Sequence, residues 1–155
     1  MVQLAIGDNA PSFELPRDGG GFVRLEAFSG RALVLLFYPG DDTPTCTTEA
    51  LDFSAAHSDF EAAGVALIGV SPDGVASHDK FKAKHGIELT LAADETKTVL
   101  EAYGVWQQKQ MYGRTYMGVV RTTILIDRAG RIARIWKVSR VKGHVQEVLA
   151  AARSL

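Results

Sequence analysis

Apolar and amphipathic segments alternate along this chain and predict alternating strands and helices. Residues 31–38 hold six consecutive apolar residues followed by Tyr38, bounded by Gly30 and Pro39. A strand buried on both faces loses its polar alternation, so this segment is expected to be a central strand. Residues 65–70 form a second such segment. Shorter strands are expected at 12–15, 22–25, 89–92, 119–126 and 132–138.

Helices are expected between these strands. After a polar loop, apolar residues recur every three to four positions from Ala50 to Phe60, and Gly64 provides a C-terminal stop. Thr43 is the expected N-cap, with Pro44 at the first helical position. Further helices are expected at 75–85, at 94–103 with its first residue as the cap, and at 143–153.

Residues 105–118 show neither the apolar period of a helix nor the alternation of a strand. They are expected to be irregular, with Trp106, Tyr112 and Tyr116 packing into the core. The order of elements then predicts an α/β protein with a thioredoxin-like fold. It has an N-terminal hairpin extension and a central mixed sheet flanked by helices. At 155 residues, 46% of them apolar, the chain is long enough for one core, so residues 1–155 are expected to form a single domain.

Charge and hydropathy exclude several classes of partner. The formal net charge of −1 argues against nucleic acid, because phosphate binding requires an excess of Lys and Arg. No apolar run approaches the ~20 residues of a membrane span. Residues 1–8 show no basic segment followed by an apolar one, so no signal peptide is expected. A cytoplasmic protein without a membrane partner is the expectation.

Cys46 is the only cysteine, which excludes an intramolecular disulfide, a CxxC redox pair and a multi-cysteine zinc site. An inert buried thiol, an intermolecular cross-link and a lone reactive thiol remain. The predicted position is the first turn of a helix, where free backbone N–H groups and the helix dipole stabilise an anion such as a thiolate. Threonines surround it, which is unusual for a core cysteine. This context favours a reactive thiol.

Residues 37–50, Phe-Tyr-Pro-Gly-Asp-Asp-Thr-Pro-Thr-Cys-Thr-Thr-Glu-Ala, resemble the active-site segment of peroxiredoxins of the bacterioferritin-comigratory-protein (PrxQ) subfamily. The pattern Pro-x-x-x-Thr-x-x-Cys is met at Pro39, Thr43 and Cys46. Similar motifs at 7–13, 102–106, 121–127 and 142–144 extend the resemblance over nearly the whole chain.

The resemblance implies a thiol-dependent peroxidase that reduces hydrogen peroxide and organic hydroperoxides. Cys46 would be the nucleophile and become a sulfenic acid. Thr43 would hydrogen-bond the peroxide, Pro39 would shield the site from water, and Arg121 would stabilise negative charge. Glu49, one turn beyond the cysteine, would orient Arg121 or would be an ordinary first-turn carboxylate.

The chain departs from the resemblance at one informative position. Many members carry a resolving cysteine five residues after the nucleophile, where this chain has Leu51. An external thiol, supplied by a thioredoxin, a glutaredoxin or a small molecule, is therefore the expected reductant. A monomer or weak dimer is expected, and a disulfide between two copies of Cys46 stays open.

No cofactor or metal is expected. The four histidines lack metal-ligand spacing, and no glycine-rich nucleotide loop follows a strand. Asp41 and Asp42 are expected to lie in a solvated turn, and His144 to be structural. An alternative function remains: a redox sensor or adaptor of thioredoxin fold, in which oxidation of Cys46 controls docking of a partner.

Overall fold

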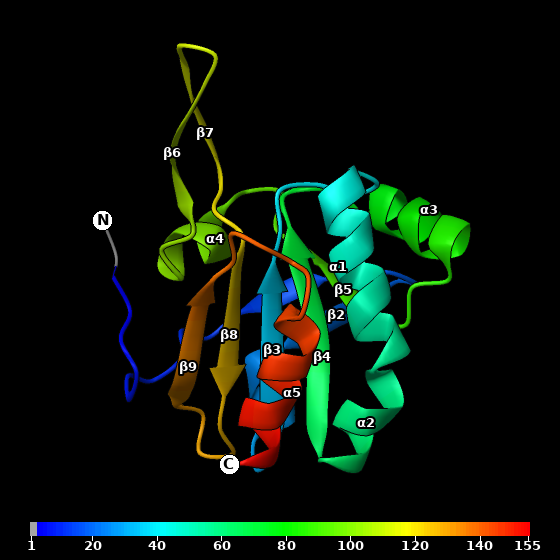
Figure 1. The fold of residues 1–155 in the computed structure, drawn as a ribbon, viewed down its shortest axis with the longest axis vertical. Coiled ribbons are helices and arrows are strands. Elements are labelled where there is room, and N and C mark those ends of the chain that lie inside the picture. The colour runs from blue at the N-terminus through cyan, green and yellow to red at the C-terminus, as the bar shows by residue number, and fades with distance from the viewer. Residues whose placement is uncertain (1–2) are drawn as a thin grey trace.

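The computed structural model describes residues 3–155, so the first two residues of the N-terminal segment examined above lie outside it. Figure 1 shows a central sheet with helices packed against it. The strands are β1 (Glu14–Pro16), β2 (Phe22–Arg24), β3 (Ala32–Phe37), β4 (Val65–Ser71), β5 (Thr90–Ala93), β6 (Trp106–Met111), β7 (Arg114–Val119), β8 (Thr122–Ile126) and β9 (Ile132–Lys137). The helices are η1 (Leu25–Phe28), α1 (Pro44–Ala55), α2 (His57–Ala62), α3 (Val75–His85), α4 (Thr98–Ala102) and α5 (His144–Arg153).

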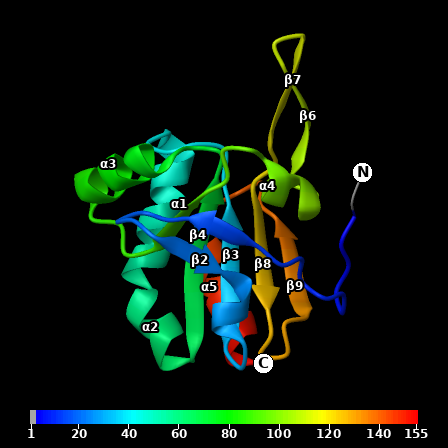
Figure 2. The same cartoon turned by 180° about the vertical axis from the view of Figure 1, so that it is seen from behind.

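The central sheet is mixed and has the strand order β5-β4-β3-β8-β9. β3 pairs in parallel with β4 and antiparallel with β8. Helices α1, α2 and α5 cover one face (Figure 1), while the β1–β2 hairpin and α4 cover the other, as Figure 2 shows from behind. The expected thioredoxin-like architecture with an N-terminal hairpin is confirmed.

The central strand shows why its sequence lacks alternation. All six residues of β3 are buried. Val34 and Leu36 belong to the core on the side of α1 and α5, whereas Leu33, Leu35 and Phe37 belong to the core on the opposite side. Both faces of the strand therefore exclude water, as the apolar run predicted.

The expectation of an irregular segment at 105–118 is wrong. These residues contain the antiparallel hairpin β6–β7, which projects from the body of the molecule (Figure 1). Its turn residues Tyr112 and Gly113 both have positive φ, as a type I′ turn requires. Because the hairpin is largely exposed on both faces, its sequence carries no apolar alternation. Tyr112 and Tyr116 are exposed, Tyr112 at 97%, and only Trp106 packs against the core.

Three smaller expectations need correction. The helix after the polar loop is broken at Ala56, although Phe53 and Phe60 on either side share one core cluster and so preserve the apolar period. The strand expected at 119–126 begins only at Thr122, as β8, and Val119 is instead the last residue of β7. Helix α4 begins at Thr98 rather than at Asp94, whose carboxylate nevertheless accepts a hydrogen bond from the backbone N–H of Leu100.

Within residues 3–155, no helix is long and apolar enough to cross a membrane.

Candidate active site

The sheet register brings Cys46 and Arg121 to the same edge. Helix α1 begins seven residues after the carboxyl end of β3, and Cys46 is its third residue. β8 runs antiparallel to β3 with Phe37 opposite Thr122, so the residue before β8 lies beside the end of β3. That residue is Arg121. Positions 75 residues apart in sequence are thus adjacent because of the strand pairing.

Arg121 joins two buried side chains of α1. Its Nη2 donates a hydrogen bond to the Cys46 Sγ at 3.1 Å, and its Nη1 donates to the Glu49 Oε1 at 2.8 Å. Cys46 is 2% exposed and Glu49 3% exposed. A guanidinium presents several N–H donors in a fixed planar fork, which suits this double contact. Arg121 therefore places a fixed positive charge against the sulfur in a site largely closed to water.

Burial and charge oppose each other in this cluster. Burial alone would lower the pKa of Arg121, but the charges and hydrogen bonds of Glu49 and Cys46 overcome that effect and raise it. Burial raises the pKa of Glu49, and Arg121 only partly offsets this. The Glu49 Oε2 has no hydrogen-bond partner among the described residues. Arg121 thus stays charged, and Glu49 occupies a position from which it can hold the guanidinium toward Cys46.

Thr43 is at the N-cap position, as expected, but its side chain makes no capping hydrogen bond. The Oγ1 donates instead to the Gly40 carbonyl at 3.2 Å. The first backbone N–H groups of a helix have no intrahelical acceptor, and an N-cap side chain usually takes one of them. Because Thr43 turns away, the N–H groups of Thr45 and Cys46 are left for another acceptor, such as an oxygen or a thiolate at the start of α1.

Pro39 lies two residues beyond β3 and is exposed, so its predicted shielding of Cys46 stays a prediction. Leu51, which stands where many peroxiredoxins of the resembled subfamily carry a resolving cysteine, is 40% exposed on α1.

The sequence interpretation missed a buried polar cluster beneath the loop that precedes α1. Asp41 was expected in a solvated turn, but its side chain is only 4% exposed and contacts His78 of α3 at 2.7 Å. Asp42 is the exposed residue of the two, and its carboxylate contacts Lys84 and His85. One sequence signal was available: His78 precedes the core residue Phe81 by three positions and so shares its buried helix face.

His144 begins α5 and is buried, with its Nε2 2.8 Å from the Thr123 Oγ1. Burial lowers the pKa of His144, and the charge of Arg121 adds to this effect although the charge of Glu147 opposes it. A neutral imidazole packed edge-on against Phe53 and Trp136 agrees with the expected structural role. Among residues 3–155, no three His, Cys, Asp or Glu side chains are grouped as metal ligands.

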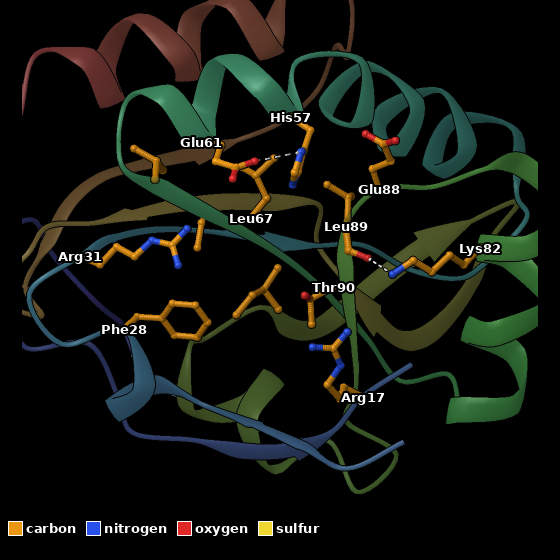
Figure 3. Close-up of a pocket in the computed structure, with 13 residues that line it drawn as sticks. Arg17, Phe28, Arg31, His57, Glu61, Leu67, Lys82, Glu88, Leu89 and Thr90 are labelled. Atoms are coloured by element: carbon orange, nitrogen blue, oxygen red, sulfur yellow. Dashed lines mark hydrogen bonds and ion pairs between the residues drawn. The ribbon is translucent and has the colours of Figure 1, made fainter. Parts of the chain in front are cut away.

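A cavity of about 670 Å³ lies away from Cys46, Glu49 and Arg121, where the first half of β4 extends beyond β5 (Figure 3). Side chains of α2, including His57 and Glu61, border it on one side, and Phe28 and Arg31 border it on the other. Cys46 does not line this cavity. The cavity is therefore separate from the cluster of Cys46, Glu49 and Arg121.

The fold defines a thioredoxin-like protein, and its only cysteine, Cys46, is paired with Arg121. Residues 6–135 match the AhpC/TSA family. The chain is 43% identical to peroxiredoxin Bcp of Bacillus subtilis, over 99% of this chain and 98% of the relative. It is 42% identical to peroxiredoxin Bcp of Xanthomonas campestris, again over 99% and 98%.

Solved structures agree. A cysteine-to-serine variant of Xylella fastidiosa PrxQ superposes with a TM-score of 0.93 at 34% identity, covering 99% of this chain and 98% of that one. The bacterioferritin comigratory protein of Xanthomonas campestris, studied for alkyl peroxide reduction, gives a TM-score of 0.87 at 40% identity, over 92% and 90%. The chain belongs to the AhpC/TSA family, as a peroxiredoxin of the Bcp/PrxQ type. These matches confirm the resemblance seen in the sequence. Peroxiredoxins are thiol-dependent peroxidases.

Proposed function

We propose that this protein reduces hydrogen peroxide and organic hydroperoxides at Cys46, and that an external thiol completes each cycle. The observation that carries this proposal is the 3.1 Å contact between the Arg121 guanidinium and the only sulfur of a cysteine in the chain. A buried positive charge favours the thiolate, which is the nucleophilic form of cysteine.

In the first half of the cycle, the Cys46 thiolate attacks one oxygen of the hydroperoxide. The sulfur–oxygen bond forms as the oxygen–oxygen bond breaks, and the product alkoxide or hydroxide takes a proton to leave as alcohol or water. Arg121 stabilises the charge on the sulfur and then on the departing oxygen. Glu49 orients Arg121, and the free N–H groups at the start of α1 donate to the peroxide. The Thr43 hydroxyl, whose hydrogen goes to the Gly40 carbonyl, accepts a hydrogen bond from the peroxide O–H.

In the second half, an external thiol attacks the Cys46 sulfenic acid and releases water, forming a mixed disulfide. A second thiol then attacks the partner sulfur of this disulfide and restores the Cys46 thiolate. A thioredoxin, a glutaredoxin or a small thiol can supply both equivalents. We propose that the protein is a monomer or weak dimer, because a single reactive thiol and an external reductant need no second subunit. We also propose that residues 1–155 form one domain and that the protein is cytoplasmic.

Peroxide consumption is expected to require an added thiol. Without reductant, the purified protein should rapidly consume about one equivalent of hydrogen peroxide per chain, because no second cysteine is present, and then only over-oxidise slowly beyond the sulfenic acid. With dithiothreitol, glutathione or a thioredoxin system, it should turn over repeatedly. The assay follows peroxide concentration over time at a fixed protein concentration. Repeated turnover without any thiol would contradict the proposed cycle, and one equivalent with every reductant would favour the sensor or adaptor function.

The Thr43 hydroxyl is expected to contribute to the rate with peroxide. Thr43→Val keeps the side-chain shape and removes the hydroxyl, so kcat/KM for peroxide should fall about ten- to a hundredfold, the range for a hydrogen bond to a charged group. Thr43→Ser restores the hydroxyl and should recover most of this loss. Stopped-flow measurement of single-turnover oxidation checks the effect apart from the reductant. Equal rates for the wild type and Thr43→Val would exclude Thr43 from the reaction.

A further inference from the structure

The loop before the reactive cysteine is tied to helix α3 by two adjacent carboxylates. Asp42 contacts Lys84 and His85 near the surface. Asp41 makes the buried contacts: its Oδ2 lies 2.7 Å from the His78 Nδ1 and accepts a hydrogen bond from the Ser77 Oγ at 2.8 Å. Residues 38–43, which connect β3 to α1, thus depend on α3 for their conformation.

The hydrogen bonds of His78 define its protonation state. Its side chain is fully buried, and its Nε2 lies 2.9 Å from the Ala92 carbonyl oxygen of β5. A carbonyl oxygen can only accept, so Nε2 must carry a hydrogen. The Nδ1 faces a carboxylate that already accepts from Ser77 and, through its Oδ1, from the Tyr38 hydroxyl at 2.7 Å. A carboxylate with two such donors is held in its ionised form, so Nδ1 also donates.

The charges around His78 support the same assignment. Asp41 from the loop and Asp73 from the connection between β4 and α3 are the acidic groups that face it, and Tyr38 is the other titratable neighbour. Burial opposes the charged imidazole, but these carboxylates and the Ala92 carbonyl together raise the pKa of His78. Burial likewise opposes ionisation of Asp41, and the hydrogen bonds of His78, Tyr38 and Ser77 overcome it and lower the pKa of Asp41.

The backbone of the loop is fixed at the same point. The Asp41 N–H donates to the Asp73 Oδ2 at 2.7 Å, and the Ser71 hydroxyl at the end of β4 donates to the same oxygen at 2.8 Å. Asp42, the next residue, has a φ of 60°, in the left-handed region that few non-glycine residues adopt and that aspartate tolerates better than most. Thr43 follows directly, and its hydroxyl donates to the Gly40 carbonyl on the other side of Asp41.

We propose that His78 and Asp41 form a buried imidazolium–carboxylate pair that positions the active-site loop, so that the rate of peroxide reduction depends on the protonation of His78. The inference rests on the proposed peroxidase function. His78 does not contact the reacting sulfur and is a positioning residue. The pair acts through Thr43 and the start of α1, where small displacements of catalytic groups reduce the rate strongly.

The sign of the pH dependence follows from the raised pKa of His78. The imidazolium contribution is complete below the ordinary histidine value of about 6.5 and is lost as pH rises through the raised value in the folded protein. The profile of kcat/KM for peroxide against pH should therefore fall on its alkaline side, as the imidazolium is lost.

The experiment compares pH profiles of single-turnover oxidation for the wild type, His78→Gln and His85→Gln. His78→Gln cannot donate to both Asp41 and Ala92, so kcat/KM should fall on the order of 10- to 100-fold and the alkaline limb should disappear. His85→Gln changes the exposed contact of the same helix to the same loop, and its alkaline limb should coincide with that of the wild type. An alkaline limb in His78→Gln identical to that of the wild type would overturn the proposal.

A measurement on the wild type keeps the proposal testable if His78→Gln does not fold. Nitrogen-15 NMR distinguishes an imidazolium, with both ring nitrogens protonated, from a neutral ring with one bare nitrogen. His78 should show two protonated nitrogens at pH 7 and lose one over the pH range of the alkaline limb. A bare nitrogen on His78 at pH 7 would overturn the inference. A wild type that consumes no peroxide at any pH would instead contradict the proposed function.

Discussion

Replacing Cys46 with serine is expected to abolish peroxide reduction and leave the fold intact. Serine is nearly isosteric with cysteine, and the side chain is buried beside Ala50 and Phe53 in one core cluster, so no large cavity is created. A serine hydroxyl does not ionise near neutral pH and is a poor nucleophile toward peroxide oxygen. The rate of peroxide loss with dithiothreitol should fall to that of buffer containing the thiol alone.

The matched control is Thr48→Ser. Thr48 lies two residues after Cys46 in α1 and is exposed. Its hydroxyl, which donates to the Pro44 carbonyl at 3.1 Å, is retained, and its activity should equal that of the wild type. Circular dichroism and thermal unfolding of both variants check that the fold is kept. Substantial peroxidase activity in a folded Cys46→Ser protein would remove Cys46 from the mechanism.

Removal of the Arg121 guanidinium is expected to give the second largest effect. Arg121→Met keeps much of the aliphatic length but leaves the sulfur without its positive partner at 3.1 Å. Loss of one preorganised electrostatic donor typically costs on the order of 10²–10³ in rate. The single-turnover rate constant for oxidation by hydrogen peroxide should fall by that factor. Arg121→Lys retains the charge but loses the planar fork that contacts both Cys46 and Glu49. Its rate should therefore lie between those of the wild type and Arg121→Met.

Two comparisons separate this effect from a general loss of stability. Arg134, which stacks on the Trp136 ring at 5.3 Å in β9, provides the control Arg134→Met, expected to keep the wild-type rate. Glu49→Gln should retain a hydrogen bond to Arg121 and lose less activity than Arg121→Met, because Glu49 acts through the arginine. A rate in folded Arg121→Met within twofold of the wild type would contradict the role given to Arg121.

The sequence predicts most of this fold because burial leaves a clear pattern in it. The apolar segments that became β3 and β4 are buried on both faces, and α1 begins at the N-cap Thr43 with Pro44 as its first residue. The β6–β7 hairpin could not be predicted in the same way. It buries little surface, and its turn uses Tyr112 with a positive φ where asparagine or glycine would have signalled a hairpin.

In the candidate site, the sequence predicts the proximity of residues in one segment but not the contacts that tertiary packing creates. Cys46, Thr43 and Glu49 lie within seven residues, so their proximity follows from one helix turn and its cap. Arg121 was found through resemblance, since only the pairing of β3 with β8 explains why it reaches the sulfur. Asp41 and His78 are 37 residues apart and belong to different elements. The spacing of His78 and Phe81 indicates that His78 is buried, but it does not indicate that Asp41 is its partner. Their contact depends on the packing of α3 against the loop.

The most direct test of the central claim is mass spectrometry of Cys46 during peroxide consumption. Intact protein treated with one equivalent of hydrogen peroxide should gain one oxygen, trapped by a sulfenic-acid reagent on the peptide that contains Cys46. Subsequent addition of a thiol should remove that oxygen and restart peroxide consumption. Peroxide consumption that proceeds while Cys46 remains an unmodified thiol throughout would contradict the account.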